Sequence, residues 1–144
     1  MATARKDITI KADADAVMEV IADIAAYPDW SSVHKAATIE STDGDGRPER
    51  VRMTVAVVGI SDEQVLDYTW DGHRSVRWTL VEGGQQRRQS GHYELTADGP
   101  VTRVHYEVRV DPKIPMPGFV VKQGMRKVVD AATVGLKRRV ERGR

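Results

Sequence analysis

The stretch GFVVKQGMRKVVDAATVGLKRRV, residues Gly118–Val140, decides the fold that we predict for this chain. Its apolar residues recur at helical spacing, which indicates one amphipathic helix; they are Val121, Met125, Val128, Val129, Ala132 and Leu136. Pro115 and Pro117 stand just before it, where prolines are tolerated. At about 1.5 Å per residue, roughly 24 residues make a helix about 36 Å long. Such a helix reaches across a whole sheet.

The sequence before this helix changes to a period of two, which predicts strands. Turn signals such as Asp71-Gly72 and Ala97-Asp98-Gly99-Pro100 separate them. Residues 42–49 are predicted as a hairpin loop and residues 82–88 as a polar loop. The alternation predicts six consecutive strands, within residues 33–40, 50–58, 64–70, 76–80, 91–95 and 104–110.

The N-terminal part predicts one more strand and a short helical region. Asp7–Ala12 alternates like a strand, and Asp13 offers a carboxylate to cap the helix that follows. The apolar stripe of that helix runs to about Ala25. Because the residue before a proline is disfavoured in the α region, Pro28 predicts that the helix ends or breaks at Tyr27.

These elements predict an α+β fold in a single domain over residues 1–144. About seven antiparallel strands form a sheet that curves around the long C-terminal helix, because an apolar sheet face must be covered. Short N-terminal helices follow the first strand. A strongly twisted sheet around one helix tends to leave space at one end. A cavity with apolar walls and a few hydroxyl groups is a default ligand site.

The composition restricts the function classes. The 144 residues are 40% hydrophobic and 30% charged, with a net charge of +1, so no nucleic-acid partner is expected. No cysteine is present, which excludes disulfides, thiolate chemistry and cysteine zinc sites. The first residues, MATARKDITIKADA, contain no apolar signal-peptide core, and no apolar run approaches a membrane span. We therefore expect a cytoplasmic protein.

Seven stretches of the chain resemble one known superfamily and occur in that superfamily's order. They are Ile21–Trp30 (IADIAAYPDW), Asp43–Met53 (DGDGRPERVRM), Asp67–Gly72 (DYTWDG), Ser75–Gly83 (SVRWTLVEG), Gly91–Gly99 (GHYELTADG), Thr102–Pro112 (TRVHYEVRVDP) and Pro115–Phe119 (PMPGF). The chain resembles the START-like (SRPBCC) superfamily with its helix-grip fold. The closest resemblance is to small actinobacterial members of its polyketide cyclase/dehydrase and lipid transport branch.

The resemblance implies where a ligand enters and what it is. Relatives admit ligands between the C-terminal helix and the loop beside the N-terminal helices, which puts Tyr27, Pro28 and Trp30 at the mouth. The implied ligand is a hydrophobic small molecule such as a lipid, an isoprenoid or a polyketide. Several aromatase/cyclases carry a pocket tyrosine near the position of His34. Those enzymes are also expected to place an arginine on residues 61–70, where this sequence has none.

The inward-facing residues of the strands and the C-terminal helix form the predicted ligand wall. They are Met53, Val55, Leu66, Tyr68, Trp70, Trp78, Tyr93, Tyr106, Phe119 and Met125, with Tyr27 and Trp30 at the mouth. Buried tyrosine and tryptophan need hydrogen-bond partners. Two interpretations stay open, because the same aromatic residues either fill a closed core or line a semi-polar cavity.

The alternative function is a polyketide cyclase/dehydrase-type enzyme. His34 is the best candidate for acid–base catalysis, because a free imidazole with a pKa near 6.5 exchanges protons near neutrality. Asp29, Ser31 and Ser32 stand close enough in sequence to orient His34, and Tyr68 is the second catalytic candidate. The simpler interpretation of His34 is a hydrogen-bonded or exposed strand histidine.

Other constellations favour structural roles. His92 and His105 are expected on the outer face of the sheet, and neither a metal site nor a cofactor is predicted. The basic tail, Lys137–Arg144, complements the dipole at a helix C-terminus. It also allows weak membrane-surface contact, or a macromolecular interaction as a third function. A monomer or a homodimer is expected.

Overall fold

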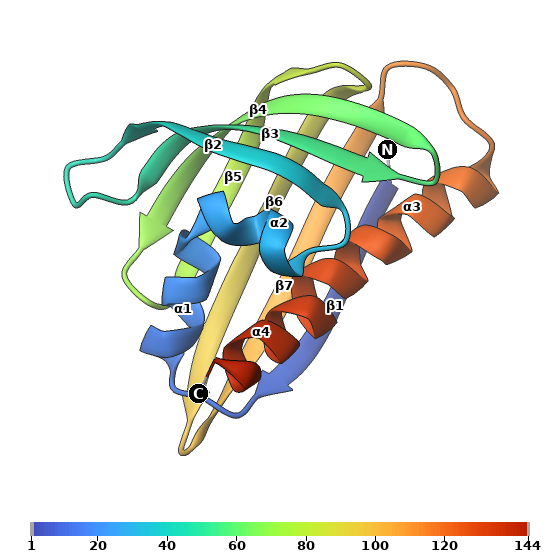
Figure 1. The fold of residues 1–144 in the computed structure, drawn as a ribbon. Helices are drawn as coiled ribbons and strands as arrows, with labels where there is room; N and C mark the ends of the chain where they lie inside the picture. The colour runs from blue at the N-terminus through green and yellow to red at the C-terminus, as the bar shows by residue number, and fades with distance from the viewer. Residues whose placement is uncertain (1, 144) are drawn as a thin grey trace.

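A computed structural model describes residues 2–143 of the protein and shows one curved sheet gripping a C-terminal helix (Figure 1). The strands are β1 (Ala2–Ile10), β2 (His34–Thr42), β3 (Pro48–Val57), β4 (Ile60–Asp71), β5 (Ser75–Gly83), β6 (Gln86–Asp98) and β7 (Val101–Pro112). The helices are α1 (Ala14–Ala22), α2 (Tyr27–Trp30), α3 (Gly118–Asp130) and α4 (Leu136–Arg142). The predicted α+β architecture is confirmed.

The sheet is antiparallel and has seven strands in the order β1-β7-β6-β5-β4-β3-β2. Consecutive strands from β2 to β7 are neighbours, as the alternation predicted, and β1 pairs with β7 at one edge. Burial alternates along most of β1, β5 and β7, so that one face of the sheet packs on the core and the other meets solvent. The helices lie in the concave side of the sheet (Figure 1).

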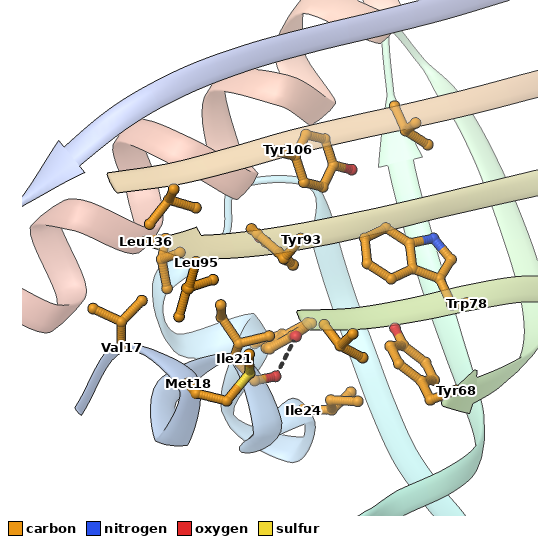
Figure 2. Packing of buried hydrophobic residues seen from close by; sticks show 14 of the residues in the cluster. Val17, Met18, Ile21, Ile24, Tyr68, Trp78, Tyr93, Leu95, Tyr106 and Leu136 are labelled. Atoms are coloured by element: carbon orange, nitrogen blue, oxygen red, sulfur yellow. Dashed lines mark hydrogen bonds between the residues drawn. The ribbon is translucent and has the colours of Figure 1, made fainter. Parts of the chain in front are cut away.

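In the core, the N-terminal helix α1 packs against the C-terminal helix α4 and against the concave face of the sheet. Asp13 caps α1 as predicted, because its carboxylate accepts a hydrogen bond from the Ala16 backbone N–H at 2.8 Å. Apolar side chains of α1 point at β6 and α4 (Figure 2), and those buried together include Val17, Met18, Ile21, Leu95 and Leu136. This cluster fixes the end of the sheet opposite the β3–β4 turn.

The long C-terminal helix is continuous in direction but widens to a π-helix at Ala131–Gly135. Two side-chain hydroxyl groups donate hydrogen bonds to backbone carbonyls of the helix in this region. Tyr93 donates to the carbonyl of Ala132 at 2.8 Å, and Thr133 donates to the carbonyl of Val129 at 2.7 Å. Side chains that insert into a helix ladder are a recognised cause of such irregularity. Gly135 lies against Trp30 of α2, where an added Cβ would meet the Trp30 carbonyl oxygen at 3.5 Å.

Tyr93→Phe is expected to lower the free energy of unfolding by about 1–2 kcal/mol, because it leaves the carbonyl of Ala132 without its donor. Urea denaturation measures the change. The matched control is Tyr106→Phe on the neighbouring strand, whose hydroxyl makes no hydrogen bond within residues 2–143 and whose ring lies 4.9 Å from that of Tyr93. Equal losses in both variants would show that the Tyr93 hydrogen bond contributes nothing.

The structure corrects several predicted boundaries, and three of them show the physical reason most clearly. β1 begins at Ala2 rather than Asp7, because pairing with β7 extends through its exposed polar residues. Tyr27 has α-helical dihedrals and begins α2, since Pro28 occupies the first turn of that helix and needs no N–H partner there. The predicted loop over residues 82–88 shrinks to a two-residue connection, because strand pairing continues to Gly83 in β5 and starts again at Gln86 in β6.

Candidate functional site

A cavity of about 150 Å³ lies between the concave face of the sheet and α3. Strands β2 to β7 supply one wall, and the inward face of α3 supplies the other. Eleven of the positions predicted from the sequence line it: Tyr27, Trp30, His34, Met53, Val55, Leu66, Tyr68, Trp78, Tyr93, Tyr106 and Met125. The sheet and the helix therefore bring most of the predicted wall to one space.

Trp70 and Phe119 do not line this cavity, which corrects their predicted place in the wall. The indole N–H of Trp70 donates to the carbonyl of Pro48 at 2.6 Å, and the Arg47 guanidinium lies 5.6 Å from its ring centre. Trp70 thus lies beyond the cavity, toward the β2–β3 loop. Phe119 is 74% exposed on the first turn of α3, because the inward face of that helix begins with Val120 and Val121.

Four aromatic residues form the inner end of the cavity, here called the aromatic end: Tyr68, Trp78, Tyr93 and Tyr106. Their rings face one another across β4 to β7 (Figure 2), with centroids 5.7 Å apart for Tyr68–Trp78 and 5.9 Å apart for Trp78–Tyr106. Burial raises the pKa of Tyr68 and of Tyr106 well above the ordinary value. Both hydroxyls are therefore protonated at pH 7, and within residues 2–143 neither has a hydrogen-bond partner.

A second group of side chains closes the cavity beside α2. The Tyr27 hydroxyl donates to the carbonyl of Ile21, the dashed line in Figure 2, which fixes its ring in place. That ring makes edge contacts with Trp30 and with His34, each at a centroid distance of 5.1 Å. Tyr27 is buried and Trp30 is partly buried. Both residues pack against the core and also line the cavity.

His34, the first residue of β2, is held at the cavity by a side chain at the end of α2. Its Nδ1 lies 2.6 Å from the Ser31 hydroxyl, so of the three predicted orienting residues the structure selects Ser31. Burial lowers the pKa of His34 to about 4. The imidazole is therefore neutral at pH 7, and it is a hydrogen-bonding group there rather than a cation.

The comparisons with known proteins agree with this geometry. The family described as "Polyketide cyclase / dehydrase and lipid transport" matches residues 1–141. The chain belongs to this family. A search of curated proteins finds no match.

Solved structures show the same fold. A START superfamily protein from Mycobacterium smegmatis superposes with a TM-score of 0.90 at 24% identity, and the match covers 99% of each chain. A Thermus thermophilus protein gives a TM-score of 0.83 at 19% identity, again over 99% of each chain. An aromatase/cyclase from Streptomyces sp. R1128 gives 0.76 at 20% identity, covering 96% of this chain and 95% of that one. These likenesses confirm the START-like helix-grip fold.

This member of the polyketide cyclase/dehydrase and lipid transport family carries a polar group of residues that the sequence analysis missed. Asp62, Gln64, Gln85, Gln86 and Gln89 line the cavity at the end nearest the β3–β4 turn, here called the polar end. Asp62 falls between the predicted strands of residues 50–58 and 64–70, although it stands two and four residues before Gln64 and Leu66 on the inward face of β4. The signal in the sequence was that Asp62 continues the two-residue spacing of the inward-facing positions of this strand.

Features outside the cavity have structural partners. The rings of His92 and His105 lie 5.6 Å apart and neither residue lines the cavity; the Nδ1 of His105 contacts the carboxylate of Asp7. Within residues 2–143 no group of three side chains is placed to hold a metal ion. In the basic tail, Lys137 pairs with Glu141 at 2.7 Å and also donates to the carbonyl of Thr9. No helix within residues 2–143 is long and apolar enough to cross a membrane.

Proposed function

We propose that this protein binds a hydrophobic small molecule, of the lipid, isoprenoid or polyketide type, in the cavity between its sheet and α3. The observation that carries the proposal is a cavity of about 150 Å³ whose lining is mostly apolar and aromatic. An apolar cavity of about this volume in another protein stays dry and takes up benzene. The family description, which includes lipid transport, supports the same ligand class.

Binding of this kind draws its free energy from the removal of apolar surface from water, at about 25 cal/mol per Å². The side chains that gain such contacts lie on both walls, for example Met53 and Leu66 on the sheet and Met125 on α3. The free hydroxyls of Tyr68 and Tyr106 orient the ligand, because a polar group of the ligand at that end satisfies them.

Native mass spectrometry of the purified protein, with solvent extraction of the co-purifying material, tests the proposal. A bound apolar mass that is released by solvent supports a ligand cavity and identifies the ligand class. A protein that carries no ligand and also fails to take up apolar aromatic compounds in titrations would contradict it, and the aromatic residues would then form a closed core.

A substitution that fills the cavity gives the first prediction for this function. Val55→Trp is expected to weaken binding of an apolar ligand about tenfold or more, because a filled cavity buries less ligand surface. Isothermal titration measures the affinity. The matched control is Thr54→Trp, which adds the same side chain to the opposite face of β3, outside the cavity. Equal affinities for the two variants would place the ligand elsewhere.

A polyketide cyclase/dehydrase-type enzyme is the second candidate function, and the Ser31–His34 pair is the observation in its favour. A neutral imidazole accepts a proton, and the protonated phenol of Tyr68 donates one. No arginine lies on β4, which counts against the aromatase/cyclase type of site. A bell-shaped pH–rate profile with a polyketide mimic, abolished by His34→Ala, would establish this function over simple binding.

A further inference from the structure

The polar end of the cavity is built around a buried carboxyl group. Asp62 is only 6% exposed, and its neighbour on the inward face, Gln64, is 3% exposed. One carboxylate oxygen of Asp62 accepts from the backbone N–H of Gln85 at 2.7 Å, and the other accepts from the side-chain amide of Gln64 at 3.0 Å. Both oxygens are thus fixed in direction by the protein.

The β5–β6 turn folds over this carboxyl group. A Cβ added at Gly84 would meet the Oδ1 of Asp62 at 3.0 Å, so the lack of a side chain there lets the turn approach closely. Within residues 2–143 no lysine, arginine or histidine forms an ion pair with Asp62. A buried carboxyl group with two amide donors and no cation retains unused acceptor capacity.

A second acceptor lies in the same part of the cavity. The side-chain oxygen of Gln86 is enclosed and has no hydrogen-bond partner within residues 2–143, the one buried side-chain atom of this kind there. Buried polar atoms in folded proteins nearly always have a partner, and an exception calls for an explanation. Gln86 and Asp62 line the same cavity, and they come from neighbouring turns of the sheet.

The register of the sheet places these acceptors relative to the rest of the site. Along β4, Asp62 and Tyr68 are six residues apart, which is about 20 Å at the usual rise of a strand. The cavity therefore runs from acceptors near the β3–β4 turn to the aromatic end. Val58 in that turn is 37% exposed and Gln85 is exposed, so the polar end lies close to the surface.

We infer that the ligand carries a hydrogen-bond donor, an alcohol, phenol or amine, which binds Asp62 and Gln86, while the mostly apolar remainder of the ligand extends along the cavity toward the hydroxyls of Tyr68 and Tyr106. This inference rests on the proposed function and narrows its ligand class. A ligand carboxylate is disfavoured at this end, because it would meet the Asp62 carboxyl group with no cation beside it. Fatty acids bound through their headgroup here are thereby excluded, whereas hydroxylated polyketides, alcohols and amines are favoured.

Four compounds that share a propylbenzene frame and differ only in the para substituent test the inference by isothermal titration at pH 7. They are propylbenzene, 4-propylphenol, 4-propylanisole and 4-propylbenzoic acid. We expect the phenol to bind about tenfold tighter than propylbenzene or the anisole, because only the phenol donates a hydrogen bond to the buried acceptors. We expect the benzoate to bind at least about tenfold more weakly than the phenol.

Two variants connect the preference to the polar end. Asp62→Asn is expected to reduce the advantage of the phenol and to improve binding of the benzoate, since the new amide donates to a carboxylate. Gln86→Leu removes the second acceptor without disturbing the hydrogen bonds of Asp62. This variant is also expected to reduce the advantage of the phenol, and it replaces Asp62→Asn in the test if that variant folds poorly. The control is Asp71→Asn at the far, exposed end of β4, which is expected to keep all four affinities.

The outcomes separate this inference from the function on which it rests. Equal affinities for the phenol, the anisole and propylbenzene would overturn the donor requirement while leaving cavity binding intact. Preferential binding of the benzoate would overturn it as well. Failure of all four compounds to bind would overturn the proposed function and this inference together.

Discussion

Replacing Gly91 by valine is expected to destabilise the protein by about 3 kcal/mol or more, because it overpacks the centre of the aromatic end. A Cβ at Gly91 would lie 2.3 Å from the Cζ2 of Trp78 and 2.5 Å from its Cε2. Trp78 cannot move aside easily, since its ring also packs against Tyr68 and Tyr106. The midpoint temperature of thermal unfolding should fall by roughly 6–12 °C, because a loss of 1 kcal/mol lowers it by about 2–4 °C in a chain of this size.

A double-mutant cycle identifies the cause of this loss. If the clash with Trp78 is responsible, Trp78→Leu should rescue Gly91→Val, and the double variant should be at least about 1 kcal/mol more stable than the summed single effects predict. Additive losses would contradict the clash. The matched control is Gly118→Ala, because a Cβ at Gly118 meets no atom within 4 Å and its stability should change little.

The sequence predicted the fold well because two simple periodicities carry it. The alternation of apolar and polar residues between residues 33 and 110 predicted a meander of antiparallel strands. The apolar stripe from Val121 to Leu136 predicted one long helix that covers the apolar face of this sheet. Boundaries were harder, since they depend on contacts distant in sequence. β1 extends to Ala2 only because β7 pairs with it, and the π-helix depends on the Tyr93 hydroxyl, which comes from another strand.

The candidate site was predicted less completely, and the reason differs from residue to residue. Inward strand positions such as Met53 and Tyr106 follow directly from alternation. Phe119 was misplaced because the rotation of α3 about its axis depends on how that helix packs, which one turn of sequence does not determine. Asp62 was missed because polarity near a Gly-Ile-Ser-Asp segment favours a turn, whereas tertiary hydrogen bonds from Gln64 and Gln85 hold it inside.

His34 is expected to make folding stability depend on pH between about 4 and 6.5. Burial lowers its pKa to about 4 in the folded protein, whereas a histidine in the unfolded chain titrates near 6.5. Between these values the unfolded chain binds the proton and the folded protein does not, so stability rises with pH. The contribution is complete above about pH 6.5, and about 2–3 kcal/mol of it is lost by pH 4.5.

Urea denaturation at pH 7.0, 5.5 and 4.5 measures this dependence, and His34→Gln isolates it. The variant cannot titrate, so its loss of stability between pH 7.0 and 4.5 should be smaller than that of the parent by about 2–3 kcal/mol. Any pH-independent cost of losing the contact with Ser31 cancels in this difference. The control is His73→Gln, which removes a histidine paired with Asp15 at the surface and should follow the parent. Parallel profiles for the parent and His34→Gln would mean that water reaches the imidazole freely, and that the cavity beside Ser31 is open rather than closed by Tyr27 and Trp30.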